Sequence, residues 1–285
     1  MGLGRMGSSL AEAFLAAGHE LTVFNRDRAK CVAFEGRADI SAEPAEAASA
    51  SDLVVVCVAD YEAASSILNA PDASAALRGR TLVQLSSGGP DEARDLGAWA
   101  ARNEIDYLDG AILTYPDGIG PGHPDTVIFY SGSRAGFDHH RGTLLALGGR
   151  PTFVGEAVGG AAAADQAWLS FEYGATAGLL QGAALCEAEE VDPGHFFGAV
   201  EVLIGELAIA AARSREMIDR GEYGGDQATL DVHVAAIEHI VDFADASGVN
   251  STFPTALLQL FGQAARSGHG GDEIAAAVET FRRPG

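Results

Sequence analysis

The pattern of apolar positions changes halfway along the chain. In the first half, short runs rich in β-branched residues alternate with helix-forming stretches. This alternation is typical of βαβ units and predicts a mostly parallel sheet. The predicted strands are Glu20–Phe24, Asp52–Val58, Thr81–Leu85, Asp106–Leu108 and Thr126–Tyr130.

After about residue 157 the strand pattern stops. The segment Gly160–Val191 is rich in alanine and contains no proline, so it predicts one helix well beyond the average globular length. Further helices are predicted at roughly 194–221, 226–247, 254–267 and 271–282, separated by glycine and proline. The sequence therefore predicts two domains, an α/β domain over 1–157 and an all-α domain over 158–285.

The chain opens with a glycine-rich segment, GLGRMG, in which Gly2, Gly4 and Gly7 have the GxGxxG spacing. Such glycines tighten the turn, let the backbone approach a pyrophosphate, and bring the next helix close. The segment, with Leu3, Arg5 and Met6 between its glycines, predicts a dinucleotide phosphate site at a helix N-terminus. When the motif is taken alone, a glycine-rich turn that binds no ligand is the alternative to a dinucleotide site.

Cations follow the strand that ends near Phe24. An NAD site has Asp or Glu here for the ribose hydroxyls, whereas this chain has Asn25 and Arg26, then Arg28 and Lys30. Positive charge at this point suits the 2′-phosphate of NADPH. An ordinary solvated helix start is the alternative, and Asp27 argues against the phosphate.

In a dinucleotide-binding fold, a strand comes directly before the glycine-rich fingerprint, which is GLGRMG in this chain. That strand is missing from this sequence, because Met1 stands directly before Gly2. Either the true start lies upstream, or the sheet lacks a central member and the protein is unstable. We expect an upstream start, because every later element is in place.

Composition narrows the function classes. The formal net charge of -22 repels nucleic-acid phosphates and anionic lipids, so neither is an expected partner. Three scattered cysteines and no signal or membrane-spanning stretch favour a soluble, cytoplasmic protein. The eight histidines show no HxH or HExxH grouping, so no metal is expected.

Characteristic segments follow one another along nearly the whole chain: GLGRMG, FNRDRAK (24–30), LSSGGP (85–90), YLDGAILTYPDGIG (107–120), IFYSG (128–132), LGGRPTFVGEAVGGAAAADQA (147–167), FEYGATAGLLQGAAL (171–185), DQATLDVHVAAIEHIV (226–241) and GVNSTFPTALLQLFGQAARSGHG (248–270). Together they resemble the imine reductases and reductive aminases, relatives of the β-hydroxyacid dehydrogenases and 6-phosphogluconate dehydrogenase.

The resemblance implies a Rossmann-like N-terminal domain, a long interdomain helix and a helical C-terminal domain that intertwines with its partner's in a homodimer. It also implies NADPH-dependent hydride transfer to the C=N bond of cyclic imines, extending to reductive amination of a carbonyl with an amine. Each active site then lies between one subunit's cofactor domain and the other subunit's helices.

Candidate catalytic residues lie on the long helix. Asp165 stands where β-hydroxyacid dehydrogenases have their lysine, and Lys30 is the only lysine in the sequence, so a lysine-dependent alcohol dehydrogenase is disfavoured. By resemblance, Tyr173 donates a proton or anchors the substrate, and Asp165 stabilises the cationic iminium. On a helix the two are separated by about 12 Å along the axis and roughly 80° around it. Core packing for Tyr173 and an interface ion pair for Asp165 are the alternatives.

Other residues complete the expected site. Ser86 and Ser87 follow a strand at its carboxyl end and face the nicotinamide or substrate, or else they serve the turn. Val58 is expected to bind the cofactor, and Ile112 and the partner's His233 to line the substrate pocket. A β-hydroxyacid dehydrogenase-like oxidoreductase and a catalytically silent NADP-binding protein stay open as alternatives.

Overall fold

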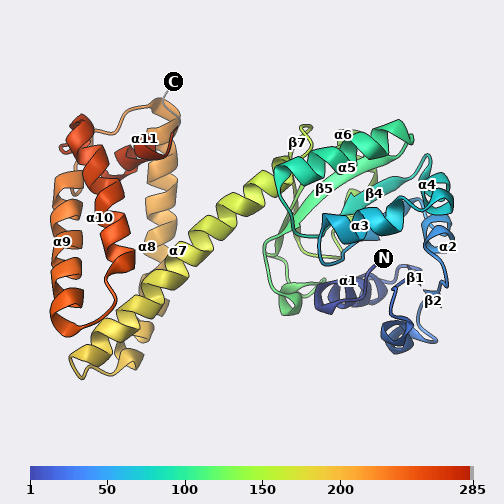
Figure 1. Cartoon of the computed structure of the whole chain (residues 1–285), viewed down its shortest axis with the longest axis horizontal. Helices are drawn as coiled ribbons and strands as arrows, with labels where there is room; N and C mark the ends of the chain where they lie inside the picture. Colours follow the sequence, from blue (N-terminus) through green and yellow to red (C-terminus); the bar gives the residue numbers. More distant parts are fainter. Residues whose placement is uncertain (283–285) are drawn as a thin grey trace. The chain divides into compact units, whose positions relative to one another are not determined.

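The computed structural model describes residues 1–282 and divides into two compact units, Met1–Phe171 and Glu172–Gly285 (Figure 1). The division falls inside the helix α7 (Gly160–Ala188). The α/β first half and the helical second half confirm the predicted fold class, while the domain boundary at residue 157 stays a prediction.

The first unit is built on a five-stranded sheet in the order β3-β4-β5-β6-β7. All neighbours are parallel except β5 and β6, which run antiparallel. A separate parallel pair, β1 and β2, lies beside it. The bounds are Thr22–Val23 (β1), Asp39–Ile40 (β2), Leu53–Val56 (β3), Thr81–Gln84 (β4), Asp106–Ile112 (β5), Val127–Gly132 (β6) and Arg150–Gly155 (β7).

Helices connect these strands and cover the sheet (Figure 1). Proline opens α2 and α5, where its fixed φ suits the first helical position, and Glu92 accepts a hydrogen bond from the Gly89 N–H that precedes α5. The bounds are Arg5–Ala16 (α1), Arg28–Phe34 (η1), Pro44–Ser49 (α2), Tyr61–Leu68 (α3), Pro71–Leu77 (α4), Pro90–Arg102 (α5), Pro116–Gly118 (η2) and Arg134–Leu144 (α6).

The core of the first unit lies on both faces of the sheet. Every residue of β4 is buried, and the neighbours Leu82 and Val83 belong to different apolar clusters. Successive side chains of a strand point to opposite faces, so β4 serves both clusters at once. This placement explains why two apolar residues stand next to each other in the strand instead of alternating with polar ones.

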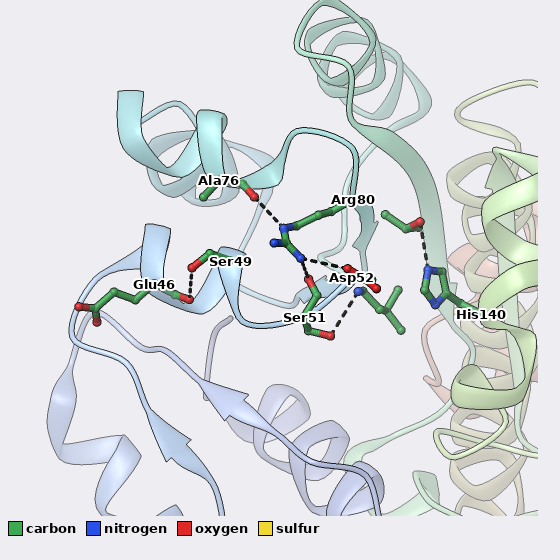
Figure 2. A network of polar contacts seen from close by, with 9 residues as sticks. Glu46, Ser49, Ser51, Asp52, Ala76, Arg80 and His140 are labelled. Atoms are coloured by element: carbon green, nitrogen blue, oxygen red, sulfur yellow. Dashed lines mark hydrogen bonds and ion pairs between the residues drawn. The ribbon is translucent and has the colours of Figure 1, made fainter.

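A polar network joins the amino ends of β3 and β4 (Figure 2). The Arg80 guanidinium donates to the carbonyls of Ser51 (2.7 Å) and Ala76 (2.9 Å) and to the Asp52 carboxylate (3.2 Å). On the other side, His140 Nε2 lies 3.2 Å from the hydroxyl oxygen of Thr81, in the first position of β4. These contacts join α4, α6 and two strands.

The first three residues of the chain lie between β1 and β3. The Gly2 N–H donates to the Phe24 carbonyl, and the Cys57 N–H donates to the Met1 carbonyl, both at 2.9 Å. A cavity of about 300 Å³ extends from them between the two sheets, lined by residues of α1, β1 and β3. The strand expected upstream of Gly2 stays a prediction.

The second unit is helical, as predicted. In it α9 and α10 pack together, and a small apolar cluster forms around Leu230, Ala264 and Ala277. Beside this cluster, buried Glu273 pairs with Arg213 of α8. The bounds are Pro193–Arg220 (α8), Leu230–Ser247 (α9), Thr252–Ala264 (α10), Ala265–His269 (η3), Ile274–Ala277 (η4) and Val278–Phe281 (α11).

Candidate functional site

The glycine-rich segment forms a tight turn into α1. Gly2 has φ +92°, and a Cβ there would lie 2.1 Å from the Cys57 carbonyl oxygen. A Cβ on Gly7 would lie 2.2 Å from the Gly2 carbonyl oxygen, whereas one on Gly4 would meet no atom within 4 Å. Gly2 and Gly7 therefore serve the fold, and Gly4, at the N-cap of α1, leaves room for a ligand at the helix N-terminus.

The polar residues after β1 divide into two kinds. Asn25 acts within the protein, because its Oδ1 accepts from the Leu3 N–H and its Nδ2 donates to the Asp27 carbonyl, both at 2.8 Å. Asp27 caps η1 by accepting from the Ala29 N–H at 3.1 Å. Asn25 thus stabilises the turn of the glycine-rich segment, and Asp27 has a structural role at the start of η1.

The cations of this loop are all solvent-exposed. Arg26, Arg28 and Lys30 lie in and just before η1, in the same connection between β1 and β2. They give a local positive charge to a chain whose net charge is -22. Such a cluster attracts a phosphate group.

A cavity of about 220 Å³ lies at the carboxyl ends of β3, β4 and β5. This edge is where open α/β sheets bind their ligands. The structure brings six predicted site residues together along this cavity: Met6, Val58, Ser86, Ser87, Ile112 and Asp165.

The two serines differ in their surroundings. The Ser86 hydroxyl is buried, accepts from the Val58 N–H at 2.9 Å and lies 3.1 Å from Oε1 of Gln84. It therefore holds together the loops that follow β3 and β4. Ser87 is exposed and lines the cavity, so its side chain is the one available to a ligand.

Asp165 lies in the second turn of α7 and is only 9% exposed, although it lines the cavity. A buried acidic side chain that lines a cavity at the ligand edge of a sheet is typical of a functional group.

Comparison with known proteins identifies the family. Residues 157–283 match the C-terminal domain of NADPH-dependent reductive aminase-like proteins, and residues 1–155 match the NAD binding domain of 6-phosphogluconate dehydrogenase. An imine reductase from Myxococcus stipitatus, solved in complex with NADP+, is 34% identical, with a TM-score of 0.91 over 99% of this chain and 98% of that one. The chain belongs to the imine reductase and reductive aminase family.

Two further family members extend this comparison. The NADPH-dependent reductive aminase of Aspergillus oryzae (strain ATCC 42149 / RIB 40) is 29% identical over 285 residues, which are 99% of this chain and 95% of that protein. A reductive aminase from Aspergillus terreus, solved with NADPH4, cyclohexanone and allyl amine, is 32% identical, with a TM-score of 0.87 over 99% of this chain and 97% of that one.

Tyr173 and His233 were predicted as site residues from the resemblance to this family. Both belong to the second unit, and neither is among the residues that line the cavity. Tyr173 is 65% exposed on α7, and His233 is half-buried near the start of α9. Their predicted roles therefore depend on surfaces that the first unit does not supply.

Sequence reasoning missed Tyr61. It follows Asp60, which caps α3 by accepting from the Ala63 N–H at 2.8 Å. Tyr61 is buried, lines the cavity and packs so closely on Gly88 that a Cβ there would lie 2.4 Å from its ring. Its place just after β3, at the ligand edge of a parallel sheet, was the available signal.

Asp109 was also missed. Its carboxylate is fully buried in β5, accepts from the Tyr61 hydroxyl at 2.6 Å, and raises the pKa of Tyr61 together with burial, the larger cause. An acidic residue inside the apolar strand YLDGAI was the available signal.

Over residues 1–282, no group of three or more His, Cys, Asp or Glu side chains is arranged to hold a metal ion.

Proposed function

We propose that this protein is an NADPH-dependent imine reductase that reduces a C=N bond to an amine. The observation that carries the proposal is the buried carboxylate of Asp165 in a cavity that adjoins the fingerprint helix through Met6. The only lysine in the sequence, Lys30, is exposed in the loop after β1, so a lysine-dependent alcohol chemistry has no candidate group at the cavity.

The residues present fit NADPH. The tight turn of Gly2, Leu3, Gly4, Arg5, Met6 and Gly7 would hold the pyrophosphate, with no Cβ at Gly4 to block its approach. Arg26, Arg28 and Lys30 would bind the 2′-phosphate. Val58, Ser86 and Ser87 lie at the sheet edge where the nicotinamide end would be held.

When bound, NADPH supplies the hydride that reduces the C=N carbon. The Asp165 carboxylate would stabilise the positive charge of the iminium substrate, so that a larger fraction of the imine is protonated at neutral pH, and the protonated C=N carbon accepts hydride more readily. Ile112 provides an apolar wall of the cavity. The Tyr173 hydroxyl donates a proton or anchors the substrate, as the family resemblance implies.

The protein acts as a homodimer in this proposal. The helix α8 leaves large apolar side chains exposed, among them Val202 at 80% and Ile209 at 62%. In the family arrangement, intertwined C-terminal helices cover such a surface, and His233 of the partner subunit lines the substrate pocket.

We place the protein in the cytoplasm, because Cys31, Cys57 and Cys186 are all free thiols.

The substrate class is a small cyclic imine, or a carbonyl compound together with an amine. The Aspergillus terreus relative was solved with a ketone and an amine, and a cavity of about 220 Å³ in the first unit offers room for part of a small ligand. Reductive amination is therefore included in the proposed activity.

The deciding experiment follows the oxidation of NADPH and of NADH at the nicotinamide absorbance. One arm uses a cyclic imine, a second uses cyclohexanone with allyl amine, and a third runs 3-hydroxy acids in the reverse direction. Imine-dependent oxidation with a preference for NADPH is expected. Turnover of hydroxy acids alone would replace the proposal by a β-hydroxyacid dehydrogenase, and NADPH binding without turnover on any arm would leave a cofactor-binding protein.

A further inference from the structure

A buried carboxylate outside the proposed mechanism lies against the start of α7. Asp109, in β5, is 0% exposed. Its Oδ1 accepts from the Tyr61 hydroxyl at 2.6 Å, and its Oδ2 accepts from the Ala162 N–H at 3.1 Å and the Ser131 hydroxyl at 3.4 Å. These bonds converge from α3, β6 and α7.

Asp109 and Ser131 together hold the first turn of α7. The Ser131 hydroxyl oxygen accepts from the Ala161 N–H at 2.9 Å, beside the bond from Ala162 to Asp109. The first N–H groups of a helix have no partner within it, and negative charge near that end is favourable. Two of these N–H groups are thus fixed to adjacent strands of the sheet.

The same turn leads directly to the cavity. Asp165 follows Ala162 by three residues, which is close to one helical turn, and both line the cavity with Tyr61. A shift of the first turn therefore moves the Asp165 carboxylate. Misplacing a reacting group by about 1 Å can cost about 100-fold in rate.

We propose that Asp109 is a positioning residue for Asp165, because it fixes the start of α7 and so sets where the Asp165 carboxylate lies in the cavity. The inference rests on the role given to Asp165 in the proposed function. Burial raises the pKa of Asp109, and the hydrogen bonds from Tyr61, Ala162 and Ser131 act against that rise.

Three variants separate this role from a general loss of packing. Asp109→Ala removes both oxygen acceptors. Asp109→Asn is the conservative variant, because its carbonyl can still accept from Ala162 while its amide donates to the Tyr61 hydroxyl. Asp106→Asn is the matched control, since it changes an Asp of the same strand whose carboxylate lies 3.5 Å from the Thr81 hydroxyl instead of at α7.

Turnover with a preformed cyclic imine tests whether Asp109 affects catalysis through Asp165. Asp109→Ala is expected to lower kcat by about 100-fold with little change in the dissociation constant of NADPH, Asp109→Asn to lose less, and Asp106→Asn to match the parent. If Asp109 acts through Asp165, Asp109→Ala adds little further loss in an Asp165→Asn background. Losses that multiply in the double variant would overturn the proposal.

Hydrogen exchange tests whether Asp109 holds the start of α7, and it needs no turnover assay. The amides of residues 159–166 should exchange faster in Asp109→Ala and in Tyr61→Phe than in Asp106→Asn. Unchanged exchange in this segment would overturn the proposal even where Asp109→Ala is too unstable to assay, because Tyr61→Phe keeps the test available. An inactive parent protein, or full activity of Asp165→Asn, would instead defeat the proposed function and leave the exchange to decide whether Asp109 holds α7.

Discussion

The two units treat their apolar side chains in opposite ways. In the first unit, large residues such as Leu82, Leu108 and Tyr130 are completely buried between the sheet and its helices. In the second, α8 has no buried residue along its described length, and Val202, Leu203 and Ile209 are more than half exposed. The first unit therefore buries its largest sheet residues within itself, whereas α8 leaves a run of apolar side chains exposed, as a surface that contacts a partner does.

What covers α8 follows from its composition. By length and hydropathy alone, α8 could cross a membrane. However, Glu201 and Glu206 lie within it, and a charged residue at the centre of a bilayer costs about 2.5–3.5 kcal/mol on insertion scales. These carboxylates argue against a membrane span, and a second copy of the chain is the partner that we propose for α8.

Charging the apolar face of α8 should have the largest effect. Val202→Glu with Ile209→Glu places two charges about seven residues apart, on one side of the helix. We expect a monomer by analytical ultracentrifugation and imine-dependent turnover at background. Glu206→Gln, on the same exposed helix, should remain a dimer. A parent protein that is monomeric and fully active would remove the need for a covering partner.

Removing one hydroxyl from the second unit should have the next largest effect. Tyr173→Phe is expected to lower kcat by about 100-fold, the lower end of general acid contributions, with NADPH binding nearly unchanged. Tyr223→Phe is the matched control, because the Tyr223 hydroxyl donates to Glu279 within the second unit. Equal activity of Tyr173→Phe and the parent protein would take Tyr173 out of the proton path.

A pair of glycine substitutions tests whether the first unit separates folding from binding. Gly7→Ala drives a Cβ to 2.2 Å from the Gly2 carbonyl oxygen, an overpacking that costs typically about 1–3 kcal/mol of unfolding free energy. Gly4→Ala meets no atom within 4 Å and should unfold like the parent without ligand. Thermal unfolding with added NADPH should show lost stabilisation in Gly4→Ala, because its Cβ would take the room left for the pyrophosphate. Full stabilisation of Gly4→Ala by NADPH would contradict the pyrophosphate assignment.

Features that depend on local sequence patterns could be predicted, whereas features that depend on contacts between distant residues could not. The glycine turn, the alternation of strands and helices, and the long alanine-rich helix are local patterns, and the structure contains each of them. The antiparallel pairing of β5 and β6 was not predicted, because pairing direction depends on how the intervening chain returns to the sheet.

The same limit applies to single residues of the site. Asn25, which is predicted to bind the cofactor, accepts through its Oδ1 a hydrogen bond from the N–H of Leu3, 22 positions away, and this contact was not predicted. Ser86 likewise holds Val58, 28 positions away. Asp109 and Tyr61 escaped notice because their meeting, 48 positions apart, depends on the order of strands in the sheet. Residue type therefore identified polar candidates, but not which backbone groups they bind within the protein.

Arg26→Ala should have a smaller and selective effect. A hydrogen bond to a charged group contributes about 1.5–3 kcal/mol, so binding of NADPH should weaken by about tenfold or more while binding of NADH hardly changes. Arg37→Ala is the control, because the Arg37 guanidinium already pairs with Glu12 at 2.6 Å. Fluorescence titration with both cofactors measures the two constants. Equal weakening of both would place the 2′-phosphate elsewhere.

The smallest expected effect is on the pH dependence of the first unit's stability. Burial, and secondarily the neighbouring His139, lowers the pKa of His140, while Asp52 and Asp106 act in the opposite direction. The unfolded chain therefore takes up a proton at about pH 6.5, where the folded protein does not. Unfolding free energy should fall as the pH drops below that value, and this contribution is fully present only above it.

In His140→Gln the pH dependence of the unfolding free energy between pH 7 and 5 should become shallower. His139→Gln changes an exposed histidine of the same helix and should keep most of the dependence. Identical slopes for His140→Gln and the parent in urea unfolding would show that the buried imidazole does not set the acid sensitivity of the sheet's amino edge.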